Sequence, residues 1–163
     1  MRRKVLLDTG PLVAFLDGRD RYNEWAMAQW ASVVPPFLTC EPVLTEACFL
    51  VRHLRDGPRR VLELVERGVV SVPFRLADDP PSIARLLVRY ASVPISLADA
   101  CLVRMSEQHS GSVVLTLDPD FRVYRRHGRH VIATIMPEWS RHLPAQVDAE
   151  LSSTGRGRGR PRR

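Results

Sequence analysis

The chain alternates between short apolar runs and stretches of helical periodicity, and this alternation limits the possible folds more than any other feature. Apolar runs predict strands at 5–7, 37–39, 69–73, 112–116 and 129–134. Helices are predicted at 11–16, 20–34, 42–55, 61–67, 80–90 and 96–108. Because strands alternate with helices, we expect an α/β fold in which helices cover both faces of a mostly parallel sheet.

The length of 163 residues and a composition that is 45% hydrophobic and 26% charged are typical of one soluble globular domain. We expect this domain to occupy residues 1–145 and a flexible basic tail to occupy 146–163. The final stretch 152–163 holds five arginines and no acid, which leaves 24 − 5 = 19 basic against 18 acidic residues elsewhere. Two explanations of the tail stay open: a solubilising end or cloning remnant, and an arm that contacts phosphates.

The cysteines and the N-terminus indicate a cytoplasmic protein with no membrane partner. The three cysteines are odd in number, lie in apolar runs and form no Cys-x-x-Cys pair: Cys40, Cys48 and Cys101. They are expected to be free thiols in a reducing compartment. The basic residues 2–4 precede an apolar run, but Asp8 and the Gly-Pro pair at 10–11 interrupt it, which argues against a signal peptide or a membrane span.

Four carboxylates lie inside or against apolar runs, where an ionised side chain is costly: Asp8, Glu46, Asp99 and Asp118. Local explanations exist for three of them. Asp8 and Asp118 can each cap a following helix, and Asp99 can form a capping box with Ser96. Glu46 lies in the middle of an apolar helix and is the hardest to explain, although a cation or a hydrogen-bond network could also satisfy it.

A shared position offers a single explanation for all four acids. In an open parallel sheet, ligands bind beyond the carboxyl ends of the strands, and Asp8 and Asp118 both follow predicted strands. If these two strands are neighbours, the helices that carry Glu46 and Asp99 can present their first turns at the same edge. Oxygen ligands without a histidine or cysteine set favour Mg²⁺ or Mn²⁺, so we expect metal-assisted hydrolysis of phosphodiester bonds.

The motifs around these acids agree in order and spacing with those of a known family. They are Leu7-Asp8-Thr9, Leu44-Thr-Glu46-Ala, Ser96-Leu-Ala-Asp99-Ala and Thr116-Leu-Asp118-Pro-Asp120-Phe. Over about residues 4–136 the chain resembles PIN domains, and more narrowly the VapC-type toxin ribonucleases of type II toxin-antitoxin systems. The resemblance implies a three-layer α/β/α architecture with a five-stranded sheet of order 3-2-1-4-5.

The resemblance also implies an RNA substrate, a divalent cofactor, a small antitoxin partner and a homodimer. It assigns catalysis to Asp8, Glu46, Asp99 and Asp118. Our hypothesis is that Asp8, Asp99 and Asp118 hold the metal. The resemblance implies that the Thr9 and Thr116 hydroxyls support the carboxylates. Asp120 is the alternative to Asp118 as the fourth acid, and the choice between them stays open.

RNA must also be held against the repulsion of four acids. The candidate arginines follow the first helix and the last acid: Arg19, Arg21, Arg122 and Arg125. Ordinary surface charge is the alternative explanation for each of them.

Two alternatives to a nuclease also stay open, namely an RNA-binding or scaffold module and another metal-dependent phosphoesterase. A haloacid-dehalogenase-like phosphatase would need an aspartate two residues after Asp8, where Gly10 stands.

Overall fold

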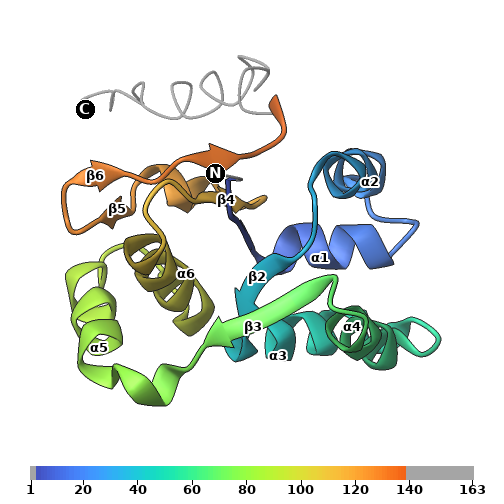
Figure 1. Ribbon diagram of the computed structural model, residues 1–163, viewed down its shortest axis with the longest axis horizontal. Coiled ribbons are helices and arrows are strands. Elements are labelled where there is room, and N and C mark those ends of the chain that lie inside the picture. Colours follow the sequence, from blue (N-terminus) through green and yellow to red (C-terminus); the bar gives the residue numbers. More distant parts are fainter. Residues whose placement is uncertain (1–2, 139–163) are drawn as a thin grey trace, which may run out of the picture.

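A five-stranded parallel sheet forms the centre of the protein (Figure 1). The computed structural model describes residues 3–138, so the predicted domain boundary after residue 145 and the basic tail lie outside the described residues. The strand order is β3-β2-β1-β4-β7, and every pair in this sheet is parallel. Its strands are β1 (Val5–Leu7), β2 (Phe37–Cys40), β3 (Val70–Phe74), β4 (Val113–Leu115) and β7 (Thr134–Ile135). The predicted order of 3-2-1-4-5 is confirmed, with β7 as the fifth strand.

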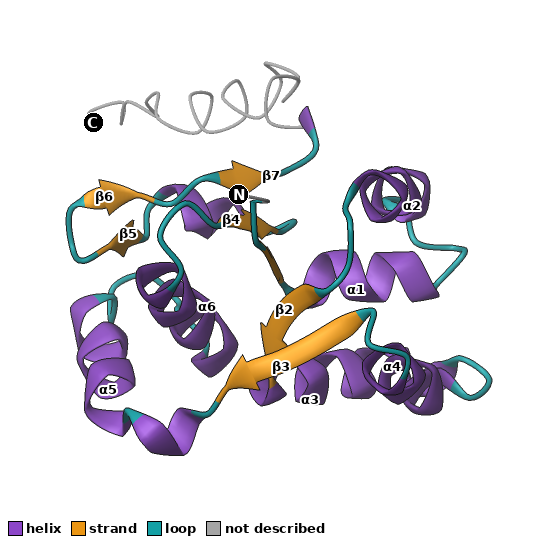
Figure 2. Ribbon diagram, in the orientation of Figure 1, coloured by secondary structure: helices purple, strands orange, loops and turns teal. Residues whose placement is uncertain are grey.

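Helices cover both faces of the sheet and form the three predicted layers (Figure 2). One face packs against α5 (Pro80–Arg89) and α6 (Leu97–Gln108). The other packs against α1 (Thr9–Leu16), α2 (Asn23–Ser32), α3 (Glu41–Leu50) and α4 (Gly57–Glu66). Successive side chains of a strand point to opposite faces, so Leu6 lies in the first core cluster and Leu7 in the second. Both leucines are fully buried, as expected for a strand covered on two sides.

Three short 3₁₀ helices complete the helical structure of the described residues: η1 (Val51–His53), η2 (Leu76–Asp78) and η3 (Pro119–Arg122).

The acids predicted as caps do lie at the starts of helices. The Asp8 side chain accepts a hydrogen bond from the Thr9 amide at the start of α1, and Asp99 forms a capping box with Ser96 at the start of α6. Asp118 caps η3 by accepting a hydrogen bond from the Asp120 amide. Local capping chemistry therefore fixes where three of the four acids lie.

The predicted last strand at 129–134 is wrong in extent. Its first half forms β6 (His130–Val131), which pairs antiparallel with β5 (Arg125–Arg126) in a separate two-stranded sheet. His127 and Gly128 adopt φ angles of 50° and 72°, and these left-handed conformations turn the chain back on itself. Only β7 reaches the edge of the central sheet, where it pairs with β4.

The cysteines agree with the expectation of free thiols. All three lie within the described residues and none forms a disulfide. Cys40 and Cys101 are buried, and Cys48 is half-buried.

Of the helices in residues 3–138, none has the length and apolar character needed to cross a membrane.

Candidate functional site

The candidate site begins where β1 and β4 end side by side. Leu7 is in register with Leu115, so the next residues, Asp8 and Thr116, leave the sheet at the same edge. The Asp8 amide donates to the Leu115 carbonyl oxygen at 3.1 Å. The buried Thr116 hydroxyl donates to Asp8 Oδ2 at 2.6 Å. The expectation that these two strands are neighbours is confirmed.

All four predicted acids line one pocket of about 400 Å³ at this edge. The lining residues are Asp8, Thr9, Gly10, Glu46, Leu50, Ser96, Asp99, Leu117 and Asp118. The acids come from four separate segments: the end of β1, the middle of α3, the first turn of α6 and the loop after β4. Parallel topology therefore gathers residues that lie up to 110 positions apart in the chain (118 − 8 = 110).

Thr9 connects Asp8 to Glu46. Its hydroxyl donates to Glu46 Oε2 at 2.9 Å, while its amide donates to Asp8 Oδ1 at 2.7 Å. Glu46, the acid without a local explanation in the sequence, is thereby fixed at the pocket by a contact across 37 positions. Thr9 and Thr116 each donate a hydrogen bond to a carboxylate of the pocket, and their supporting role in catalysis stays a prediction.

Asp118 lies in the pocket wall, whereas Asp120 does not belong to the lining. The Asp118 amide donates to Thr116 Oγ1 at 2.8 Å, and Asp118 Oδ1 accepts from the Asp120 amide at 2.8 Å. Thr116 thus supports both Asp8 and the loop that carries Asp118. This position favours Asp118 over Asp120 as the fourth acid.

Burial makes three of the aspartates in the pocket hard to ionise: Asp8, Asp99 and Asp118. Loss of solvent raises the pKa of Asp8 to about 7, against the lowering effect of the hydrogen bonds from Thr116 and Thr9. The negative charges of Asp99 and Asp118 raise it further. The pKa values of Asp99 and Asp118 are also raised, first by burial and then by neighbouring carboxylates. The acids are therefore close enough to repel one another, which favours a bound cation.

The donor set suits a hard divalent cation. Asp8, Asp99 and Asp118 offer only carboxylate oxygens, the ligands preferred by Mg²⁺ and Mn²⁺. Within residues 3–138, no three or more His, Cys, Asp or Glu side chains already form a ready metal cage. Mg²⁺ needs no such cage, because it keeps several waters and commonly binds through one or two carboxylates. The chemistry of these residues therefore fits the predicted metal.

Tyr124 is a neighbour of the site that the sequence did not identify. The residue is fully buried, and its hydroxyl has no hydrogen-bond partner among the described residues. Burial raises the pKa of Tyr124, and the charges of Asp99 and Asp118 raise it further. Its ring packs edge-on against Phe121 at 5.3 Å between centroids. Tyr124 therefore stays neutral beside the acids, and no spacing signal in the sequence marks it.

The four predicted RNA-binding arginines do not line the acidic pocket: Arg19, Arg21, Arg122 and Arg125. Arg19 and Arg21 follow the far end of α1, which starts at the pocket and is about 12 Å long. Arg125 donates from Nη1 to the carbonyl oxygens of residues 122–124. These bonds give Arg125 a structural role at the end of η3, and contact with RNA stays a prediction for all four.

Comparison with known proteins agrees with the fold. A family model of the PIN domain matches residues 5–126, which include β1 to β5 and all four acids. The crystal structure of Mycobacterium tuberculosis VapC20, described as a sarcin-ricin loop cleaving toxin, is similar with a TM-score of 0.67. The identity is 24%, over 74% of this chain and 94% of that chain. A search of curated proteins gave no match. Because the family model spans most of the chain, this protein belongs to the PIN domain family.

Proposed function

We propose that this protein is a divalent-metal-dependent endoribonuclease and the toxin of a toxin-antitoxin pair. The observation that carries the proposal is the pocket in which four separate segments place Asp8, Glu46, Asp99 and Asp118 together. Membership of the PIN domain family and the structural similarity to VapC20, a sarcin-ricin loop cleaving toxin by its description, support the same activity.

Each acid has a role in this proposal. Asp8, Asp99 and Asp118 would hold the cation, and Thr116 keeps Asp8 oriented through its 2.6 Å hydrogen bond. A bound Mg²⁺ or Mn²⁺ would lower the pKa of a coordinated water and offset charge on the scissile phosphate. Glu46, which accepts a hydrogen bond from Thr9, would orient the attacking water and accept its proton at a carboxylate oxygen.

The activity is tested by incubating the purified protein with total RNA, first with a chelator and then with added Mg²⁺ or Mn²⁺. We expect cleavage only when a metal is present, and mapping of the new RNA ends should give discrete sites. Asp99→Asn should lose cleavage, while the exposed Asp56→Asn serves as a control outside the pocket. Asparagine tolerates the left-handed backbone of residue 56, so this control should fold normally.

The same experiment separates the alternatives. Binding of RNA without cleavage under every metal condition would favour a scaffold module. Hydrolysis of a simple phosphate monoester without cleavage of RNA would favour another metal-dependent phosphoesterase. Either result would contradict the proposed nuclease.

Asp118 and Asp120 should differ in their effects on cleavage. Because Asp118 lines the pocket and Asp120 does not, we expect Asp118→Asn to lower the initial rate by about 100-fold or more. Asp120→Asn should cost less than about tenfold, since its side chain acts outside the pocket. Initial rates at saturating Mg²⁺ measure the difference, and a larger loss for Asp120→Asn would reverse the assignment.

The surface beside the pocket supports the proposed antitoxin. Phe49 and Leu50 at the end of α3 have exposed fractions of 61% and 46%. Large exposed apolar side chains often mark a site of protein contact, and Leu50 also lines the acidic pocket. A small protein bound here would cover the pocket mouth. The homodimer and the cytoplasmic location stay predictions.

A further inference from the structure

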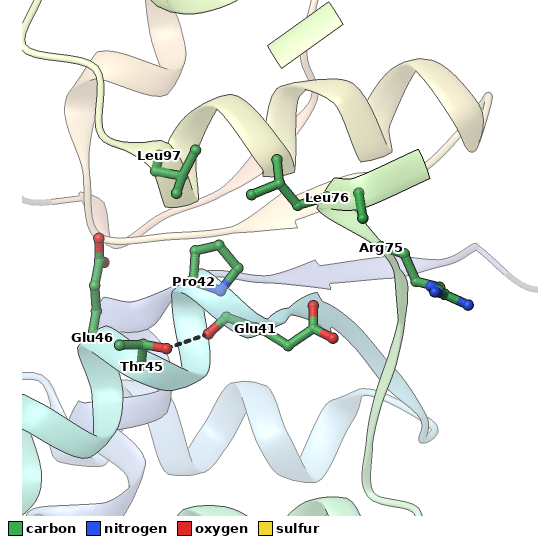
Figure 3. A pocket seen from close by; sticks show the side chains of 8 residues that line it. Glu41, Pro42, Thr45, Glu46, Arg75, Leu76 and Leu97 are labelled. Carbon is green, nitrogen blue, oxygen red and sulfur yellow. Dashed lines mark hydrogen bonds between the residues drawn. The ribbon is translucent and has the colours of Figure 1, made fainter. Parts of the chain in front are cut away.

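A second and larger pocket adjoins the acidic pocket. Its volume is about 590 Å³, and it lies between α3, η2 and the first turn of α6. It is lined by Glu41, Pro42, Thr45, Glu46, Arg75, Leu76, Ala77 and Leu97 (Figure 3). Glu46 belongs to the lining of both pockets. A ligand that reaches from one pocket to the other would pass this carboxylate.

The apolar and the charged side chains of the second pocket lie in different parts of it. In Figure 3, Pro42, Leu76 and Leu97 lie in its middle, with Glu46 at one end and Arg75 at the other. The Glu41 carboxylate lies between this apolar part and Arg75, so the part of the pocket next to Glu46 is apolar and the outer part carries both an acid and a cation. Pockets of this size with apolar walls and a few polar groups are typical sites for small organic groups.

The outer cation is available to a ligand. Arg75 follows directly after β3, and its Nε lies 3.7 Å from Asp78 Oδ1 in an ion pair of which both side chains are largely exposed. An exposed pair of this kind contributes little stability and exchanges readily with another anion. A phosphate is a good replacement, since guanidinium groups bind phosphate oxygens through paired hydrogen bonds.

We propose that this second pocket binds the nucleotide adjacent to the scissile phosphate of a single-stranded RNA. Its base would lie against Pro42, Leu76 and Leu97, and Arg75 would contact the next phosphate. The inference rests on the proposed nuclease function. The order of groups in the two pockets favours it. The acids, the apolar side chains and the Arg75 guanidinium follow one another as a phosphate, a base and the next phosphate do along RNA. A paired base is stacked within its helix, so the occupant must be single-stranded.

Binding can be measured with a fluorescein-labelled single-stranded RNA of about ten nucleotides, using full-length protein with Asp99→Asn to keep the RNA intact. Adding Leu97→Ala should weaken binding about tenfold, since the base loses an apolar contact. Val88→Ala on α5 is the control, because Val88 is 78% exposed and lies outside the pocket. A duplex of the same sequence should bind much more weakly.

Two arginines that flank β3 provide a second matched pair. Arg75 follows the strand at the pocket, whereas Arg67 precedes it at the opposite edge of the sheet. Arg75→Gln should weaken RNA binding about threefold and reduce the slope of log affinity against log salt by about 0.7. Arg67→Gln should change neither quantity. Melting temperatures of all variants verify that they are folded.

The outcomes separate this inference from the proposed function. If the wild type cleaves RNA with metal but Leu97→Ala and Arg75→Gln bind RNA as their controls do, the pocket assignment is overturned and the nuclease stands. Equal binding of duplex and single strand would also overturn it. If the wild type neither binds nor cleaves RNA, both proposals fail.

Discussion

Replacing Asp8 with asparagine is expected to stabilise the metal-free protein above about pH 7 and to abolish RNA cleavage. Burial raises the pKa of Asp8 from 3.8 to about 7 in the folded state. Between these two values the folded protein keeps a proton that the unfolded chain has released. The free energy of unfolding of the wild type therefore falls as the pH rises through this window.

Asparagine removes this penalty and keeps the cap of α1, because its Oδ1 can accept from the Thr9 amide as Asp8 Oδ1 does now. The bond with Thr116 is reversed: the hydroxyl now donates to Asp8 Oδ2, whereas it would accept from the asparagine Nδ2. We expect the variant to gain about 1–3 kcal/mol at about pH 8 and almost nothing at about pH 4. The loss of a metal ligand should lower the cleavage rate by about a thousandfold or more.

Thermal or urea unfolding at several pH values in the presence of a chelator measures the first effect, and RNA cleavage with saturating Mg²⁺ measures the second. Asp56→Asn is again the control, since this exposed acid should affect neither quantity. Destabilisation by Asp8→Asn at high pH, or cleavage at the wild-type rate, would contradict the assignment of Asp8.

Thr116→Val is the second substitution from which we expect a large effect. The hydroxyl of Thr116 donates to Asp8 Oδ2 and accepts from the Asp118 amide, so valine breaks both bonds without changing the size of the side chain much. An unpaired amide and a weakened carboxylate site should cost about 2–3 kcal/mol of stability. The rate of cleavage should fall about 10–100-fold, because neither acid is held in place.

The pH profile distinguishes this positioning role from simple destabilisation. The hydrogen bond from Thr116 lowers the pKa of Asp8. In Thr116→Val this bond is lost, so the pH at which cleavage activity rises should be higher than in the wild type. Thr116→Ser keeps the hydroxyl and should restore the wild-type profile. A profile that is unchanged in Thr116→Val, with activity lost only in proportion to unfolded protein, would argue against positioning.

The sequence predicted those parts of the site that depend on local chemistry. Asp8 caps α1, and Asp99 forms the capping box of α6 with Ser96. The positions of both acids follow from this capping chemistry. The bond between Thr9 and Glu46 joins residues on different helices, so its geometry depends on how α1 packs against α3. Sequence patterns identify such residues as candidates but contain no information about the packing.

Other features escaped prediction for the same physical reason. Tyr124 comes near Asp8 and Asp99 through the packing of separate segments, and no pattern in the sequence indicates this. The sequence does not distinguish β6 from β7, because the residues between them, Ile132 and Ala133, include no glycine or proline that would mark a break. The second pocket joins three segments that are separated by whole helices and strands.

The capping role of the acids determines how an inactive form of this protein should be made. Three of the four carboxylates begin a helix as well as lining the pocket. Alanine at these positions would remove a cap and cost about 0.5–2 kcal/mol, so an alanine scan would confuse lost folding with lost chemistry. Asparagine caps nearly as well as aspartate and binds cations poorly. Asparagine variants are therefore the suitable inactive reagents for trapping RNA or a protein partner on a correctly folded surface.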